Sequence, residues 1–388
     1  MSLDDVQFQE AAIRMLRAAV AHDRVAHAYL FVGPRGVGKG RLAREFAKLL
    51  LCTSPKGGGA DGLDSCGACA SCGRIDRDTH PDLYWFRKEA NRNEFRLALV
   101  ARRGGSDGTP PWLTATVTES VALMPMEAPR TVTVLDDAEL LNHEAANALL
   151  KVLEEPPPHA VLILLCADAS QLPGTILSRC QWVRFKPLPE TFVAKKLAES
   201  IALRTSPKTG AADEAPPRRV SKDEAAFVCH FAGGSVEQAE GLVRSGLWDL
   251  KRGFLPRLAD MDEAAALDVA DAIGRWSREQ AKETNRSGEA REETALRRAL
   301  ARLALAAAAS AFRDAAVEAG ACGAAALTNV DQPEVIKALA AWSADACDRA
   351  VGLLADAQEQ IDRYVHTELA TENALIQVAR LRLESARI

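Results

Sequence analysis

The residues that decide the fold are Ala28-Tyr-Leu-Phe-Val32 and, directly after them, Gly33-Pro-Arg-Gly-Val-Gly-Lys39-Gly40. The first five predict a short buried strand, which the glycine ends. Residues 41–51 predict a helix with one apolar face, made by Leu42, Phe46, Leu49 and Leu50. A glycine-rich loop that ends in lysine, between a strand and a helix, is typical of the Walker A phosphate loop.

The loop keeps the features that hold a phosphate except at its last position. Glycines let backbone N–H groups wrap a phosphate, and the helix N-terminus and a lysine add positive charge; these residues are Gly33, Gly36, Gly38 and Lys39. The motif then requires Ser or Thr to hold Mg²⁺, whereas Gly40 has no side chain. Two interpretations stay open: a loop that binds nucleotide, and a loop retained only as part of the fold.

Two more apolar segments, residues 131–135 and 161–165, predict further buried strands. Residues 142–153 predict a helix between them, and the prolines that start at Pro156 end it. Because strands that alternate with helices form parallel sheets, the first part of the chain is expected to be an α/β domain.

Two acids follow the strand 131–135, where the Walker B acid of a phosphate-loop protein would lie. Asp136 is the candidate metal ligand, either directly or through water. Asp137 stands where a glutamate usually orients water, and it is one methylene shorter, which matters because position decides phosphoryl-transfer rates. The alternative is that both acids are solvated residues at a strand end.

Four cysteines form the pattern C-x13-C-x2-C-x2-C, namely Cys52, Cys66, Cys69 and Cys72. The two-residue spacing lets neighbouring thiolates face one tetrahedral ion, and the distant cysteine closes the site, so we expect a structural Zn²⁺. A ferredoxin-type iron–sulfur cluster would need a further cysteine where this chain has Asp76. The remaining alternative is four unrelated free thiols.

Composition and charge narrow the possible functions. A chain of 388 residues is longer than one core usually serves, so two or three domains are expected. The net charge of -5 gives no global basic signature for nucleic-acid binding. No apolar run is long enough to span a membrane, and the acidic residues 1–10 are not a secretory signal. The chain has nine cysteines, an odd number, and no secretory signal is expected. We therefore expect a reducing cytoplasm, in which clustered cysteines are metal ligands and not disulfides.

The rest of the chain divides by composition. Residues 54–64 and 103–111 are rich in turn-forming residues and have the character of insertions. Residues 204–223 are polar and rich in proline, which predicts a loop. After about Gly246 the sequence is rich in Ala and Leu with helical periodicity, so residues 247–388 predict a helical domain.

Several motifs, in their order along the chain, carry a resemblance to a known family. They are His27-Ala-Tyr-Leu-Phe31, the cysteine cluster, His80-Pro-Asp82, Asp136-Asp-Ala-Glu-Leu-Leu-Asn142, Asn147-Ala-Leu-Leu-Lys-Val-Leu-Glu-Glu-Pro156 and Leu172-Pro-Gly-Thr-Ile-Leu-Ser178-Arg179-Cys180. With them, residues 8–189 resemble the bacterial clamp-loader AAA+ family, and most of all its delta-prime branch. Weaker matches at residues 231–236 and 361–370 resemble the family's lid and collar domains.

The resemblance implies a P-loop AAA+ parallel-sheet domain with the zinc insertion at residues 1–186, a small helical lid at 187–246 and an all-α collar for oligomerisation at 247–388. It implies a cytoplasmic part of the DNA polymerase III holoenzyme, which assembles with gamma/tau and delta subunits to load the sliding clamp on primed DNA. Ser178 and Arg179 are implied to supply an arginine finger to ATP bound by a neighbouring subunit. The local alternative for the arginine is an ion pair with Glu154 or Glu155.

Four positions depart from the pattern of the ATP-hydrolysing gamma/tau subunits. The chain has Gly40 instead of Ser or Thr, Asp137 instead of Glu, and Gln238 where the sensor-2 arginine would lie. Residues 165–168 offer no Thr or Asn for a sensor-1 role. We therefore expect that the isolated chain does not hydrolyse ATP, whereas ATP binding stays open.

Two other functions compete with the clamp-loader interpretation. One is an autonomous or gamma/tau-like P-loop ATPase, against which Gly40 and Gln238 argue. The other is a zinc-dependent nucleic-acid-binding module, against which the acidic balance and the lack of basic and aromatic residues around residues 66–72 argue.

Overall fold

A five-stranded parallel sheet with the order β2-β3-β4-β1-β5 forms the centre of the first part of the chain. Its strands are β1 (Ala28–Val32), β2 (Leu83–Phe86), β3 (Thr131–Leu135), β4 (Ala160–Cys166) and β5 (Gln181–Arg184). In the middle of the sheet Leu30 lies opposite Leu164 on one side and Trp182 on the other. The central strands are buried on both faces, as their continuous apolar sequences require.

The computed structural model describes residues 2–87, 95, 100, 115–205, 220–285, 290–320, 327–363 and 365–385. The chain divides into two compact units, Met1–Leu188 and Pro189–Ile388, and each is described by itself. The expected insertion at 103–111, most of the expected loop at 204–223 and Cys322 lie outside the described residues.

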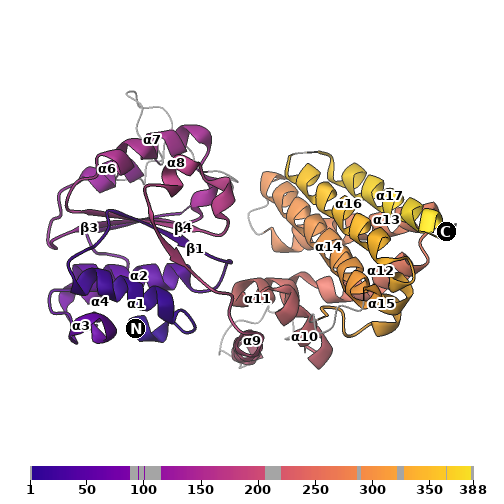
Figure 1. The fold of residues 1–388 in the computed structure, drawn as a ribbon, viewed down its shortest axis with the longest axis horizontal. Coiled ribbons are helices and arrows are strands. Elements are labelled where there is room, and N and C mark those ends of the chain that lie inside the picture. Colours follow the sequence, from indigo (N-terminus) through magenta and orange to yellow (C-terminus); the bar gives the residue numbers. More distant parts are fainter. Residues whose placement is uncertain are drawn as a thin grey trace. The chain divides into compact units, whose positions relative to one another are not determined.

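Helices cover both faces of the sheet in the first unit (Figure 1). One layer holds α1 (Glu10–Ala21), α2 (Lys39–Leu51), α3 (Gly59–Gly62) and α4 (Ala70–Asp76). The other holds α6 (Val117–Ala122), α7 (His143–Glu154) and α8 (Gly174–Leu177). Short 3-10 turns lie at Leu3–Asp5, Ala138–Leu140 and Ala169–Gln171. Two helix layers around a parallel sheet confirm the expected α/β class.

The strands expected at 28–32, 131–135 and 161–165 are present, the last one residue longer at each end. The helices expected at 41–51 and 142–153 are α2 and α7, and the Asn142 side chain caps α7 by accepting the Ala145 N–H at 2.9 Å. The two edge strands, β2 and β5, were not predicted, because four-residue runs cannot be told from a helical turn by periodicity.

The second unit is helical, and no strand occurs among its described residues. Its helices are α9 (Glu190–Thr205), α10 (Lys222–Phe231), α11 (Val236–Ser245), α12 (Leu247–Ala259), α13 (Glu263–Thr284), α14 (Ala290–Ala319), α15 (Pro333–Ala340), α16 (Ala344–Asp362) and α17 (Thr367–Ser385). The expected helical character of residues 247–388 is confirmed; the boundary at residue 246 stays a prediction. In the described residues no helix is long and apolar enough to cross a bilayer.

A buried lysine joins three segments of this second unit. Lys251, on α12, is fully buried, and its Nζ lies 2.5 Å from Oδ1 of the buried Asp331, which precedes α15. The same Nζ lies 3.9 Å from the ring centroid of Phe227 on α10 and 4.8 Å from that of Trp248. Two aromatic rings and one carboxylate thus take the place of water around this charge.

Candidate functional site

The phosphate loop connects β1 to α2 at the carboxyl edge of the sheet. Gly33 donates its N–H to the carbonyl of Cys166 at the end of β4, at 3.2 Å. A Cβ at this position would lie only 2.7 Å from the Cβ and the carbonyl oxygen of Phe185, so the close approach of the chain after β5 requires glycine. Gly38 has a φ of 100°, a left-handed conformation that also favours glycine.

Lys39 is the first residue of α2, and its side chain turns back over the loop. Its Nζ donates hydrogen bonds to the carbonyls of Gly33 at 2.6 Å and Pro34 at 2.8 Å. Burial lowers the pKa of Lys39, and the negative charges of Glu139 and Asp136 oppose that shift. The lysine charge is therefore held where the Walker A motif places the phosphate.

The space beside Gly40 does not exclude a larger residue at the Cβ position. A Cβ there would lie 3.7 Å from Cζ2 of Trp85 and 3.8 Å from Cδ1 of Leu165, which are ordinary van der Waals contacts. The missing hydroxyl is thus not explained by a collision at Cβ.

The two acids after β3 differ in environment. Burial and the neighbouring Asp137 raise the pKa of Asp136, and Arg87, whose Nε lies 3.5 Å from its carboxylate, opposes the rise. Asp137 has a φ of 55°, and its carboxylate lies 3.3 Å from Nη2 of Arg35. Asp136 thus lies near enough to Lys39 for its charge to act on the lysine, and its role as a metal ligand stays a prediction, whereas Asp137 pairs with an arginine of the phosphate loop.

Glu139 is a site residue that sequence reasoning missed. It is buried, its Oε1 lies 3.4 Å from Nη2 of Arg35, and its Oε2 accepts the N–H of Ala167 at 3.2 Å. It joins the phosphate loop to the chain after β4. Its position three residues after Asp136 was visible in the sequence, but periodicity does not show that the turn at 138–140 aims the side chain inward.

The four predicted cysteines come together at the far end of α2. Cys52 follows that helix, Cys66 lies in the next loop, Cys69 caps α4 and Cys72 lies in its first turn. Their Sγ atoms all lie within 4.8 Å of one another, with Cys52–Cys69 at 3.9 Å and Cys66–Cys72 at 4.0 Å. Four sulfurs around Zn²⁺ at Zn–S distances of about 2.3 Å would be roughly 3.8 Å apart, so the residues fit a tetrahedral ion.

Backbone N–H groups around the cluster favour thiolates. The N–H groups of Ala68 and Cys69 donate to Cys66 Sγ at 3.4 and 3.2 Å, and that of Cys72 donates to Cys69 Sγ at 3.4 Å. Burial would raise the pKa of Cys69, but the N–H donors of Cys72 and Thr53 outweigh it and lower that pKa to about 5. Burial raises the pKa of Cys52 and of Cys72, so the surroundings favour the thiolate, the form that binds a metal ion, at Cys66 and Cys69 only.

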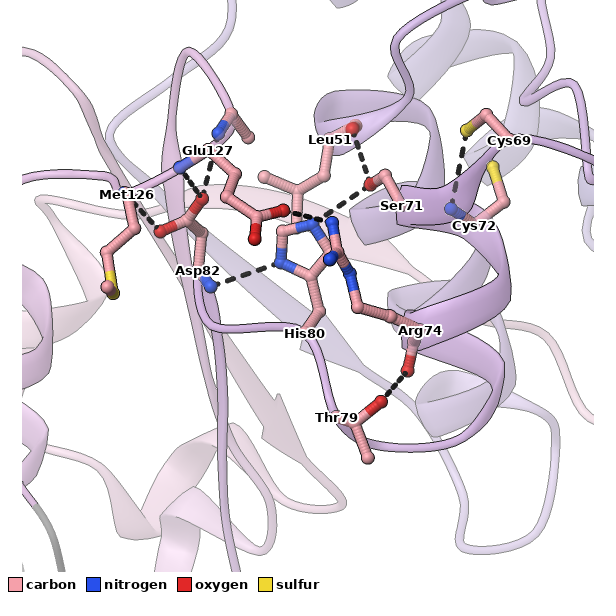
Figure 2. Close-up of polar contacts among 11 residues, drawn as sticks. Leu51, Cys69, Ser71, Cys72, Arg74, Thr79, His80, Asp82, Met126 and Glu127 are labelled. Atoms are coloured by element: carbon pink, nitrogen blue, oxygen red, sulfur yellow. Dashed lines mark hydrogen bonds and ion pairs between the residues drawn. The ribbon is translucent and has the colours of Figure 1, made fainter.

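A buried histidine ties the cysteine-bearing segment to the sheet (Figure 2). Ser71 donates its hydroxyl proton to the carbonyl of Leu51 at 2.7 Å, so it accepts from Nε2 of His80 at 3.0 Å. Nδ1 of His80 accepts the N–H of Asp82 at 3.1 Å, which fixes the neutral tautomer. Burial lowers the pKa of His80 as well. This histidine is a structural residue.

Asp82 completes the network that Figure 2 shows at the start of β2. Its buried carboxylate accepts the N–H groups of Met126, Glu127 and Ala128 at 2.6, 2.9 and 2.8 Å. Burial would raise the pKa of Asp82, but these three donors outweigh it and lower the pKa. Asp82 thereby holds the loop before β3 against the segment that leads into β2.

Replacing Asp82 by alanine is expected to lower the free energy of unfolding of the chain by about 3 kcal/mol or more, because three partly buried N–H groups lose a charged acceptor and each hydrogen bond to a charged group contributes roughly 1.5–3 kcal/mol. Chemical denaturation monitored by circular dichroism measures the change. Glu127→Ala is the control: it removes a half-exposed ion pair with Arg74, worth about 1 kcal/mol or less. Equal losses in both variants would contradict the anchoring role of Asp82.

Arg179 lies at the opposite edge of the sheet from the phosphate loop. Tyr29 of β1 pairs in parallel with Gln181 of β5, so Arg179 lies beside the amino end of β1, while the loop follows its carboxyl end. The four residues of β5 alone span about 13 Å at 3.3 Å per residue. The structure therefore does not bring Arg179 to the phosphate loop of its own chain.

The arginine makes local contacts on the surface. Its Nη2 lies 3.0 Å from Oε1 of Glu154 at the end of α7, and its Nη1 donates to the carbonyl of Thr175 at 3.1 Å and to Ser178 Oγ at 3.4 Å. The side chain of Arg179 is 37% exposed and that of Glu154 is 52% exposed. The local alternative, a pair with Glu154, is thus present, and water screens it enough that it contributes little stability.

Gln238, the residue expected at the sensor-2 position, lies in the second unit. It occupies the first turn of α11, where its N–H donates to Ser235 Oγ at 3.0 Å. Because the two units are described separately, its relation to the phosphate loop stays a prediction.

A strand–phosphate loop–helix unit, with an acid at the end of a neighbouring parallel strand, defines the P-loop class of proteins, within which AAA+ proteins fall. Residues 8–189 match the family described as DNA polymerase III, delta subunit. This segment is similar to the gamma/tau and delta-prime subunits of DNA polymerase III, which are clamp-loader proteins of the AAA+ class.

Two relatives illustrate the match. The chain is 37% identical over 177 residues to the DNA polymerase III subunit delta′ of Pseudomonas aeruginosa, which covers 46% of this chain and 47% of the relative. It is 34% identical over 205 residues to the tau/gamma subunit of Haemophilus influenzae, which covers 52% of this chain and 26% of the relative. The match thus spans less than half of either relative.

Solved structures are similar at lower identity. A DNA polymerase III gamma subunit-related protein of Thermotoga maritima aligns over 96% of this chain and 99% of its own, with 16% identity and a TM-score of 0.40.

Proposed function

We propose that the chain is a delta-prime-type subunit of a clamp loader, which assembles in the cytoplasm with gamma/tau and delta subunits to place the sliding clamp on primed DNA. The observation that carries this proposal is that Arg179 is exposed at the sheet edge opposite the phosphate loop of its own chain. An arginine in that place is available to a neighbouring subunit and not to its own nucleotide site.

The chemistry of Arg179 fits a role at a neighbour's ATP site. Charge spreads over the oxygens of a transferring phosphoryl group, and a planar guanidinium matches them with two parallel donors. The competing pair with Glu154 is exposed and weak, so binding to a phosphate can replace it. Ser178, whose Oγ donates to the carbonyl of Thr175 at 3.1 Å, helps to shape the turn that presents the arginine.

The chain's own phosphate loop supports the same role. Lys39 and the glycines form a cradle, but Gly40 offers no oxygen to Mg²⁺ and Asp137 pairs with Arg35. Catalysis of phosphoryl transfer depends almost entirely on position and electrostatics, so these two changes remove the metal and water arrangement together. ATP can still be a ligand of the cradle without being hydrolysed.

We further propose that the cysteine cluster holds one structural Zn²⁺, with Cys52, Cys66, Cys69 and Cys72 as the four ligands. When bound, the ion would fix the start of α4 to the end of α2. A site with four protein ligands has no open position, so its role is in folding and not in catalysis.

The isolated chain is expected to show ATP turnover no higher than that of its own Lys39→Ala variant, since Gly40 leaves Mg²⁺ without its hydroxyl ligand. Release of inorganic phosphate from ATP measures the rate, with the cognate gamma/tau subunit as the positive control. Turnover that is robust in the wild-type chain and abolished by Lys39→Ala would favour the competing function, an autonomous P-loop ATPase.

Co-purification tests the assembly directly. The chain is expected to form a stable complex with the cognate gamma/tau and delta subunits, and that complex is expected to load the clamp on primed DNA faster than the same mixture without the chain. A failure to co-purify with both subunits, with each shown to be folded, would reject the proposal. A salt-sensitive affinity of the chain alone for DNA would instead favour a nucleic-acid-binding module.

A further inference from the structure

The guanidinium group of Arg179 is held by its own chain through both terminal nitrogens. Nη2 lies 3.0 Å from Oε1 of Glu154, and Nη1 donates to the carbonyl of Thr175 at 3.1 Å. A guanidinium group binds a phosphate best through two parallel donors, either Nη1 with Nη2 or Nε with Nη2. Each of these pairs includes Nη2, so Glu154 competes with a phosphate for the arginine.

The position of Glu154 is unfavourable for the helix that carries it. Glu154 is the last residue of α7, and α7 and α8 lie in the same layer of the first unit (Figure 1). The carboxyl end of a helix carries partial negative charge, so an acidic side chain there does not stabilise the helix. The contact with Arg179, in the turn after α8, supplies the positive charge that this end of α7 favours.

The ion pair is weak enough to be released. Both side chains are partly exposed, and an exposed ion pair shifts an equilibrium by about fivefold at most. A nucleotide phosphate carries more negative charge than a carboxylate and offers several oxygens to a planar guanidinium group. A phosphate close to Arg179 therefore displaces Glu154, and Glu154 binds the arginine again when the phosphate leaves.

We propose that Glu154 restrains Arg179 until a neighbouring subunit presents a nucleotide phosphate to it. Glu154 acts through the arginine and touches no substrate, so it is a positioning residue. It lowers the ATPase rate of the neighbour's site in the resting complex, and it loses this effect once clamp and primed DNA bring the phosphate to the arginine. The inference rests on the proposed function, because it assigns a regulation to the same arginine.

The restraint itself is tested on the isolated chain. Phenylglyoxal modifies accessible guanidinium groups, and mass spectrometry of peptides follows its reaction with Arg179. Glu154→Gln is expected to raise the rate of this modification by about two- to fivefold, because the arginine loses its counter-ion. Glu155→Gln is the matched control, since it removes the exposed carboxylate next in the chain, and it is expected to leave the rate unchanged. Equal rates in the wild type and Glu154→Gln would overturn the proposal, whether or not the chain assembles.

The regulation is tested in the reconstituted complex without clamp and DNA. Glu154→Gln is expected to raise the basal rate of phosphate release by up to about fivefold at the one site that Arg179 serves, and to keep the stimulated rate. The Glu154→Gln/Arg179→Ala double variant is expected to match Arg179→Ala, because the restraint has no target without the arginine. A wild-type basal rate in Glu154→Gln, or a rise that persists in the double variant, contradicts the regulation.

The restraint and the proposed function fail separately in these experiments, and circular dichroism verifies that every variant is folded. If Arg179→Ala lowers the stimulated rate while Glu154→Gln behaves as the wild type in both assays, the restraint is rejected and the clamp-loader role stands. If Arg179→Ala keeps the stimulated rate of an assembled complex, the arginine finger is rejected, and the regulation by Glu154 is rejected with it.

Discussion

In a reconstituted clamp loader, replacing Arg179 by alanine is expected to lower the ATPase rate that clamp and primed DNA stimulate, without a loss of assembly. An arginine finger supplied in trans is typically worth on the order of 10³–10⁵ in rate at the site it serves. One neighbouring ATP site would lose its arginine finger while the other sites keep theirs. The ATPase rate of the whole complex is therefore expected to fall only by the fraction that this one site contributes. Steady-state phosphate release at equal complex concentration measures it.

Glu154→Gln is the matched variant for this experiment. It removes the carboxylate that pairs with Arg179 at 3.0 Å but leaves the guanidinium free. If Arg179 acts on a neighbour's phosphate, Glu154→Gln keeps the stimulated rate while Arg179→Ala loses it. If the arginine only supports its own turn, the two variants behave alike, and both show a stability change of about 1 kcal/mol or less with unchanged ATPase. Arg179→Lys is expected to show a stimulated ATPase rate close to that of Arg179→Ala, since an ammonium group lacks the two parallel donors of a guanidinium group.

The second large effect concerns the cysteine cluster. Protein purified without chelators is expected to contain one zinc per chain, and Cys72→Ser is expected to lose it. Structural Zn²⁺ sites contribute apparent binding free energies of about 10–16 kcal/mol in small zinc domains at neutral pH, so local folding around α4 depends on the ion. Elemental analysis gives the zinc content, and limited proteolysis shows whether residues 52–76 become accessible.

Cys229→Ser is the control for the cluster. Cys229 is buried on α10 and far in sequence from the four ligands, so its replacement costs some packing but leaves the zinc content at one. Zinc absent from the wild-type chain, or retained in Cys72→Ser, would contradict the four-thiolate site. The experiment also separates zinc from iron, which would appear in the same analysis.

The parts of this chain that local sequence rules govern were predictable. β1, β3 and β4 are continuous apolar runs between turn residues, and glycine at 33 and 38 follows from the conformation that a phosphate loop requires. The cysteine spacing predicted a cluster because Cys66, Cys69 and Cys72 lie within one short segment of the chain. Only Cys52 comes from a separate segment, at the end of α2.

Features that arise only from packing were not predictable. β5 has the exposed ends Gln181 and Arg184, so nothing in its composition marks a strand until β1 is beside it. The hydrogen bond of Glu139 to Ala167 and the stack of Arg44 on Trp85 join residues that lie far apart in the chain. A single sequence carries no signal for such contacts, because each residue alone is ordinary for an exposed loop or helix face.

The buried Lys251 has a mechanical consequence for the second unit. The charge of Lys251 is balanced by Asp331 and lies against the rings of Phe227 on α10 and Trp248 on α12. Loss of Asp331 from this position would leave a buried charge without its counter-ion, which is costly in free energy. We therefore expect α10, α12 and the segment before α15 to move together when this part of the chain is displaced.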